Sequence, residues 1–97
     1  MKIRILPDAE HDLEIGADFY EAQRAGLGHY FNDCLMSDIE SPQLYAGVDE
    51  RQHGLLRCMS KRFPFAIFYD LTSETIDIYA VLDCRQDPLK LKYRLEQ

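Results

Sequence analysis

The spacing of apolar residues in the first part of the chain predicts a short strand and then a helix. Residues 2–5 alternate polar and apolar side chains as a strand does, and Pro7 ends that strand and suits the first turn of a helix. Ile15 and Phe19 are expected to widen the apolar face of this helix, which should end near Gln23. The main face is marked by apolar residues that recur every three or four positions: Ala9, Leu13, Ala17 and Tyr20.

A second periodic segment follows a glycine-containing break at residues 25–28. Pro42 should end this second helix, because proline cannot continue the hydrogen-bonded backbone. So short a connection between two helices leaves them antiparallel, and we therefore expect a helical hairpin. The apolar residues of the second helix lie on one face of roughly three turns: Leu27, Phe31, Cys34, Leu35 and Ile39.

The second half of the chain has the pattern of strands. Residues 55–59, 65–71 and 75–82 are three candidate strands, separated by short polar segments. The run 65–71 is apolar on both faces except at Asp70, which is typical of a central strand that is covered on at least one side. The alternation in the last strand predicts a core face made of Ile76, Ile78, Ala80 and Leu82.

The predicted order of elements is β-α-α-β-β-β, which belongs to the α+β class. We expect a short N-terminal strand and an antiparallel helical hairpin packed on an antiparallel sheet of about four strands, in one domain over residues 1–97. With 46% hydrophobic residues, 97 residues can form one modest core, which argues against a multidomain enzyme and a disordered chain. Residues 89–97 alternate like a strand, whereas Leu91 and Leu95 fit a helical turn after Pro88, so strand, helix and disorder stay open for this segment.

Charge is distributed unequally between the two halves of the chain. The total of 17 acidic and 11 basic residues gives a net charge of −6, which argues against a protein whose whole surface binds a nucleic-acid backbone. Residues 1–50 contain three Lys or Arg and eleven Asp or Glu, a net charge of −8. Residues 51–97 contain eight and six, a net charge of +2. The helical half is therefore acidic, and the sheet half leaves a compact basic site possible.

The three cysteines, Cys34, Cys58 and Cys84, are widely spaced and form neither a CxxC motif nor a zinc-type pattern with histidine. We expect reduced thiols that behave as small apolar side chains, and we expect no metal ion and no cofactor. The chain has no N-terminal apolar run long enough for a signal peptide, and no segment reaches the about 18 apolar residues of a membrane span. These features predict a cytoplasmic protein with no membrane partner.

Four stretches of the chain form a recognisable set when they are taken in order. They are A-E-H-D-L at residues 9–13, G-L-G at 26–28 just ahead of Tyr30 and Phe31, R-F-P-F-A-I-F-Y at 62–69, and I-D-I-Y-A-V-L-D-C-R-Q-D-P at 76–88. The most specific pieces are the R-F-P-[FY]-x-I-x-Y strand and the V-L-x-x-R-x-x-P strand end. Over nearly the whole chain, this set resembles the RelE/ParE superfamily of bacterial type II toxins, often labelled plasmid stabilisation proteins.

The resemblance implies a small growth-inhibiting toxin that is neutralised by an antitoxin protein encoded beside it. ParE-like members inhibit DNA gyrase, whereas RelE-like members cleave messenger RNA in the ribosomal A site. We favour the ParE-like interpretation, because Asp83 and Gln86 stand where many relatives have histidine and a basic residue. A carboxylate beside Arg85 would weaken a phosphate site by about a kcal/mol, or a few if the pair is partly buried. The lysines that RelE-like enzymes have ahead of the strand hairpin are also missing from residues 49–53.

Under the RelE-like alternative, the resemblance implies catalytic roles for three residues. Arg57 and Arg85 would stabilise charge on the scissile phosphate, and Tyr93 stands near the position of a C-terminal tyrosine. Each arginine also has a structural interpretation, in which Arg57 lies at a strand edge or pairs with a helix acid and Arg85 pairs with Asp83 or Asp87. A non-toxic module that keeps the fold and binds a partner is a third possibility.

The antitoxin is the expected protein partner, with DNA gyrase, or alternatively the ribosome and its messenger RNA, as the target. In the superfamily the antitoxin lies on the toxin as an extended or helical strap, and we expect it in a groove beside the helical hairpin or on an unpaired sheet edge. A homodimer or a hetero-oligomer with the antitoxin is also compatible with the sequence. The basic residues that could contact a partner, or simply face solvent, are Arg62, Lys90, Lys92 and Arg94.

Overall fold

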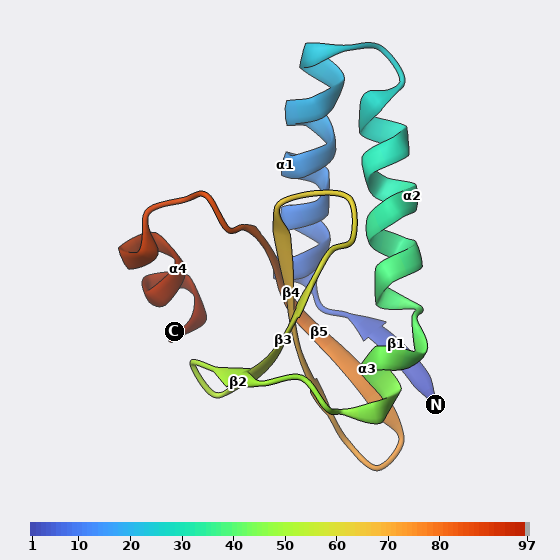
Figure 1. Cartoon of the computed structure of the whole chain (residues 1–97), viewed down its shortest axis with the longest axis vertical. Coiled ribbons are helices and arrows are strands. Elements are labelled where there is room, and N and C mark those ends of the chain that lie inside the picture. The colour runs from blue at the N-terminus through green and yellow to red at the C-terminus, as the bar shows by residue number, and fades with distance from the viewer. Residues whose placement is uncertain (97) are drawn as a thin grey trace.

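The computed structural model, which describes residues 1–96, has the helical hairpin and the strands in the predicted order (Figure 1). Two short elements, α3 and β2, add to that order, and the end of the chain is a helix. In chain order the elements are β1 (Lys2–Ile5), α1 (Pro7–Gln23), α2 (Leu27–Ile39), α3 (Pro42–Ala46), β2 (Arg51–Gln52), β3 (Leu55–Met59), β4 (Phe65–Leu71), β5 (Thr75–Asp83) and α4 (Pro88–Leu95).

The two added helices begin where proline occupies a first helical turn. Pro42 ends α2 as expected but also begins α3, because the N–H that proline lacks would have no helical partner at that position. Pro88 has the same place in α4, and the Asp87 side chain caps that helix by accepting a hydrogen bond from the Leu89 N–H at 2.9 Å. The Asp-Pro pair therefore decides the ambiguous C-terminal segment in favour of a helix.

The sheet has five strands in the order β1-β5-β4-β3-β2. The expectation of an antiparallel sheet holds for the pairs among β2 to β5, but β1 pairs parallel with β5, so the sheet is mixed. A parallel pair requires a long crossover connection, and the helical hairpin and the other strands lie between β1 and β5 in the chain. The apolar strand β4 occupies the centre of the sheet, as its sequence predicts.

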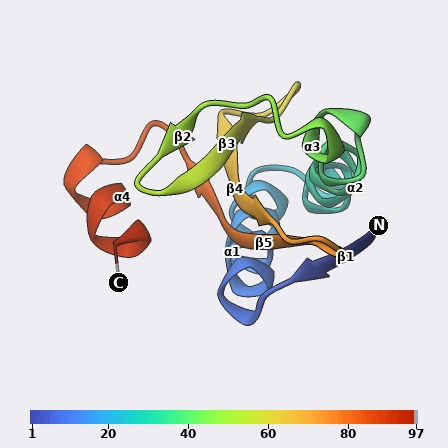
Figure 2. The ribbon, with the colours of Figure 1, turned by 90° about the horizontal axis from the view of Figure 1, so that it is seen from below.

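The two faces of the sheet are covered by different elements. The helices α1, α2 and α3 cover one face, where the largest buried side chains include Phe31, Leu35, Ile67 and Tyr69. On the other face, α4 packs Leu91 and Leu95 against a smaller buried cluster of Ala66, Phe68, Ala80 and Leu82. Figure 2 shows α2 and α4 on opposite sides of the strands. We call these two faces the hairpin face and the α4 face.

The predicted core face of β5 is only half right. Ile76 and Ile78 do lie in the hairpin-face core, but Ala80 and Leu82 lie on the α4 face. The cause is a β-bulge in β5. Tyr69 pairs with Ile78, whereas the preceding Phe68 pairs with Ala80. Tyr79 is therefore an extra residue without a partner on β4. One extra residue exchanges the two faces for the rest of the strand.

The two helices of the hairpin can pack closely because Gly16 on α1 leaves room for a side chain of α2. The ring of Phe31 packs against Gly16, where a Cβ atom would lie only 2.6 Å from the ring. Ile15 and Phe19, expected to widen the core face of α1, are instead 55% and 52% exposed. The sheet and α2 pack on the side of α1 that carries Leu13 and Gly16, so within residues 1–96 no layer covers the flank with Ile15 and Phe19.

A carboxylate from α1 helps to hold the turn between the two helices. Gly26 precedes α2 with a φ of 89° and has no side chain to cap the helix. The Glu21 carboxylate accepts hydrogen bonds from the N–H groups of Gly26 at 3.0 Å and Gly28 at 2.9 Å. These bonds to the charged form lower the pKa of Glu21. Among residues 1–96, no helix is long and apolar enough to cross a membrane.

Candidate functional site

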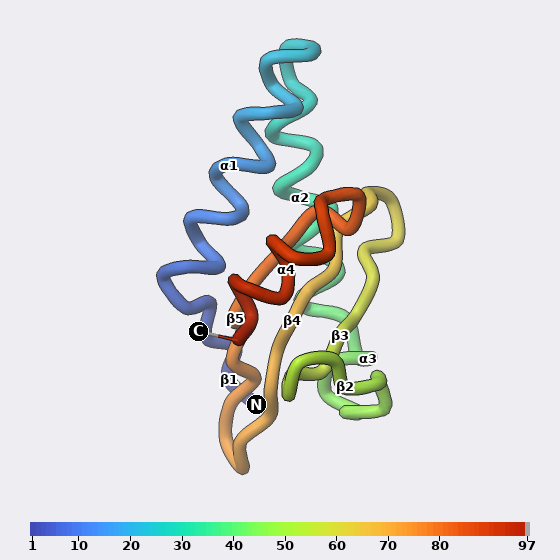
Figure 3. The backbone as a smooth tube through the Cα atoms, turned by 90° about the vertical axis from the view of Figure 1, so that its left-hand side faces the viewer, coloured from blue at the N-terminus to red at the C-terminus, as the bar shows by residue number. Residues whose placement is uncertain are grey.

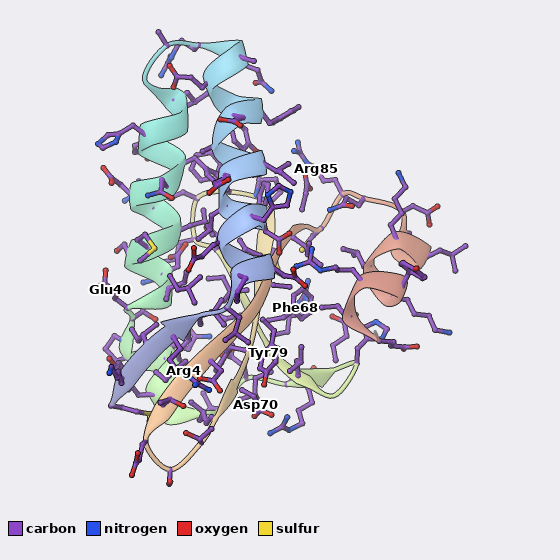
Figure 4. The ribbon with its side chains drawn as sticks, turned by 180° about the vertical axis from the view of Figure 1, so that it is seen from behind. Arg4, Glu40, Phe68, Asp70, Tyr79 and Arg85 are labelled. Carbon is purple, nitrogen blue, oxygen red and sulfur yellow. The ribbon has the colours of Figure 1, made fainter. Side chains whose placement is uncertain are left out.

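The two arginines singled out from the sequence lie near the same end of the sheet. Arg57 is on β3, on the α4 face, and Arg85 is the second residue after the end of β5. In Figure 4, Arg85 lies at the end of the sheet opposite to Arg4 and Asp70. The structure therefore brings the segment just after β5 to the neighbourhood of Arg57.

Arg57 is half-buried and forms no ion pair within residues 1–96. Its Nη2 atom lies 3.6 Å from the Sγ atom of Cys84, and that sulfur lies 3.6 Å from the Sδ atom of Met59. A polar hollow of about 470 Å³ opens beside it, lined by Glu50, Arg51, Gln52 and Arg57. A guanidinium that no carboxylate neutralises is a suitable group for binding an anion.

Arg85, in contrast, is engaged by its neighbour Asp83. The Arg85 guanidinium binds the Asp83 carboxylate in a bidentate way, with Nε donating to Oδ1 at 3.0 Å and Nη2 to Oδ2 at 2.8 Å. The backbone N–H of Arg85 also donates to Asp83 Oδ1 at 2.8 Å. These hydrogen bonds lower the pKa of Asp83 and raise that of Arg85. Nη2 also lies 3.5 Å from the hydroxyl of Tyr20 on α1. A phosphate would have to compete with this carboxylate for the guanidinium.

Tyr93 does not join the two arginines. It lies on α4 with 73% of its surface exposed, and no hydrogen bond of the described residues links it to Arg57 or Arg85. The hydrogen bonds of the described residues therefore do not connect the three residues that the RelE-like alternative implies.

The basic residues expected to contact a partner divide into two groups. Arg62, Lys90 and Lys92 are exposed and form no ion pair in the part of the chain that the structure describes. Arg94 instead turns inward, and its two terminal nitrogens donate to the carboxylate of Asp12 at 2.6 and 2.8 Å. These hydrogen bonds raise the pKa of Arg94.

Asp12, which the sequence patterns did not indicate as a site residue, is buried and links three elements of the fold. Its side chain is only 6% exposed, and it also accepts a hydrogen bond from the Val81 N–H at 3.0 Å. It thus joins α1, β5 and α4, and Figure 3 shows α4 lying in front of β4 and β5. A second contact, between His53 Nδ1 and Glu96 Oε2 at 2.8 Å, holds the end of α4 to the turn after β2. One feature of the sequence could have indicated that Asp12 is buried: it stands next to Leu13, on the apolar side of the helix.

An apolar groove runs beside Asp12, between α1 and the end of β5. It has a volume of about 330 Å³, and Ile15 and Phe19 form its exposed edge. Its polar rim is made of Asp83 and Gln86 together with the Asp12–Arg94 pair. The groove lies beside the helical hairpin, which is where the sequence predicts a partner segment.

A row of charges crosses the opposite end of the α4 face and was also not predicted. Asp70 and Asp77 are direct partners across β4 and β5, and an arginine lies beside each of them. Figure 4 labels one residue of each ion pair, Arg4 and Asp70. Arg4 binds Asp77 through two contacts of 2.7 Å, and Arg51 lies 3.2 Å from Asp70. The hydrogen bonds from Arg4 lower the pKa of Asp77. The arginines thus offset the repulsion between two facing carboxylates.

Comparison with known proteins identifies the fold. No family model and no curated protein matches the chain. Among solved structures, a chain described as "Chromosomal ParDE TA system from P. aeruginosa" superposes with a TM-score of 0.69 at 17% identity, covering 84% of this chain and 92% of that one. The protein has the fold of that ParDE chain, which confirms the RelE/ParE-like fold that its motifs indicate.

Proposed function

We propose that this chain is the toxin of a type II toxin–antitoxin system, a single ParE-like domain that stops growth through DNA gyrase and is neutralised by an antitoxin encoded beside it. The likeness to the ParDE chain over 84% of the sequence carries this proposal. The motifs of β4 and the end of β5 support it independently of that superposition, because they are features of the amino-acid sequence.

The local geometry favours a protein target over RNA cleavage. Arg85 is engaged by Asp83, and within residues 1–96 Tyr93 forms no hydrogen bond to either arginine, which argues against a ready-made site for a scissile phosphate. Inhibition of gyrase requires a complementary surface rather than a set of catalytic groups. The apolar groove beside α1 and the exposed basic side chains of α4 offer such surfaces to the target or to the antitoxin.

The proposal is tested by producing the chain in a bacterium that lacks the neighbouring gene, and then with that gene restored. We expect colony counts to fall by orders of magnitude with the chain alone, to recover with the neighbouring product, and the two proteins to co-purify. Unchanged growth together with a chain that purifies alone would rule the toxin function out.

A RelE-like ribonuclease is the second candidate, and the unpaired guanidinium of Arg57 is the observation that favours it. The double variant Arg57→Ala/Arg85→Ala separates the candidates, with Lys61→Ala as an exposed control in the next loop. We expect growth arrest to survive the double change, because gyrase inhibition does not use these two residues as catalytic groups. Relief of growth arrest, with full antitoxin binding retained, would favour the ribonuclease.

A further inference from the structure

The flank of α1 that carries Ile15 and Phe19 has the features of a contact surface. These two apolar side chains are four residues apart, so they adjoin on the helix, and each is more than half exposed. Glu14 and Asp18, also exposed and four residues apart, run parallel to them. Within Pro7–Gln23, α1 contains six Asp or Glu and no Lys or Arg. The flank is thus an apolar pair beside a line of negative charge.

The outer side of α4 has the opposite charge and the same spacing of apolar residues. Leu89 and Tyr93 are 71% and 73% exposed and are again four residues apart. Lys90 and Lys92 are exposed and stand on either side of this pair by helical geometry. The inner side of α4 is already used, because Leu91 and Leu95 pack on the sheet. The outer apolar pair therefore has no covering layer within residues 1–96.

We propose that α4 of one copy of this chain docks on the α1 flank of a second copy, and that the second copy does the same in return. Leu89 and Tyr93 of one copy would meet Ile15 and Phe19 of the other, which places one lysine of the Lys90/Lys92 pair on the side that carries Glu14 and Asp18. Within the described residues, α4 is the segment that combines an exposed apolar pair with unpaired lysines, so the chain itself supplies the partner that the acidic flank fits.

The two surfaces belong to different elements of the same copy, so the exchange is expected to close as a two-fold dimer. Asp12 and Arg94 hold the chain's own α4 near the first half of α1, and Figure 3 shows the second half of α1 rising beyond α4. Phe19 lies in this second half. Because each copy would present both members of the contact, a two-fold arrangement repeats it twice and leaves no open end.

The contact area is small, with four exposed apolar side chains from each copy, so the dimer is expected to be weak and dependent on concentration. Opposite charges on exposed side chains also make it sensitive to salt, because ions screen such pairs. Sedimentation velocity of the purified full-length chain over a wide concentration range, at low and at high salt, should show dimer that grows with concentration and declines with salt.

Charge reversal tests the interface itself. The variants Glu14→Lys/Asp18→Lys and Lys90→Glu/Lys92→Glu should each weaken self-association at least about tenfold, because each places like charges together at both contacts. An equimolar mixture of the two should form dimer again, since one contact then has the wild-type charges and the other has both charges reversed. All four positions are exposed, and circular dichroism checks that each variant is folded.

Two results would overturn the proposal. One is a wild-type chain that stays monomeric at every concentration, and the other is a mixture that associates no better than the separate variants. Neither result bears on growth arrest, because the measurement uses purified protein and needs neither the antitoxin nor gyrase.

Discussion

Replacing Arg94 with alanine is expected to lower the free energy of unfolding by about 2 kcal/mol, because it leaves a buried carboxylate without its partner. The Asp12 side chain is 6% exposed, and after the change it would keep only the hydrogen bond from the Val81 N–H. The same change removes the polar anchor of α4 in α1, so the helix should also detach more readily. Urea unfolding at neutral pH measures the first effect, and amide hydrogen exchange in α4 measures the second.

Lys92 provides a matched control on the same helix. Its side chain is exposed and unpaired within the described residues, so Lys92→Ala should change the free energy of unfolding by no more than about 0.5 kcal/mol. Arg94→Lys should lie between the two, because an ammonium keeps the charge but not the two parallel hydrogen bonds. Equal stabilities of the Arg94→Ala variant and the wild type would show that α4 is not anchored through Asp12.

Acidification is expected to destabilise the fold below about pH 4, the ordinary pKa range of Asp and Glu. Hydrogen bonds from the N–H groups of Gly26 and Gly28 lower the pKa of Glu21, and those from Arg4 and Arg85 lower the pKa of Asp77 and Asp83. The unfolded chain therefore binds more protons than the folded one in this range. The stability from these groups is complete above the unfolded pKa values and is lost as pH falls through the folded ones.

The measurement is the urea midpoint from neutral pH down to about pH 3. Glu21→Gln is the informative variant, because an amide oxygen can accept the same backbone hydrogen bonds but does not titrate. Its stability should fall less steeply with acid than that of the wild type. If the wild-type midpoint were the same at both ends of the range, the three carboxylates would not have the lowered pKa values on which this expectation rests.

Local patterns were sufficient to predict the longer elements. The helix bounds at Pro7, Gln23 and Ile39 follow from proline, glycine and apolar spacing, which act within a few residues of each other. The central position of β4 follows from its continuous apolar run, since only a strand covered on both faces buries such a run completely.

Features that depend on distant partners could not be predicted from those patterns. The bulge at Tyr79 depends on how β4 and β5 align, and nothing in the alternation of β5 itself signals it. The exposure of Ile15 and Phe19 depends on where α2 packs, because their spacing fits a core face equally well. The parallel pairing of β1 is decided by the path of the whole chain.

The same distinction applies to the candidate site. The pairing of Arg85 with Asp83 was one of the interpretations open from the sequence, because the two residues are close neighbours in the chain. The pairing of Asp12 with Arg94 spans 82 residues, so no local rule could propose it. Arg94 consequently seemed to be a surface cation, whereas the structure uses it to hold α4.

The state of DNA in cells that produce the chain without its antitoxin is the most direct test of the proposed function. The ParE-like account predicts that growth stops, that a reporter plasmid loses negative supercoiling, and that an SOS response begins while messenger RNA stays intact. Growth arrest with normally supercoiled plasmid and messages cut during translation would contradict gyrase as the target and identify the ribosome instead.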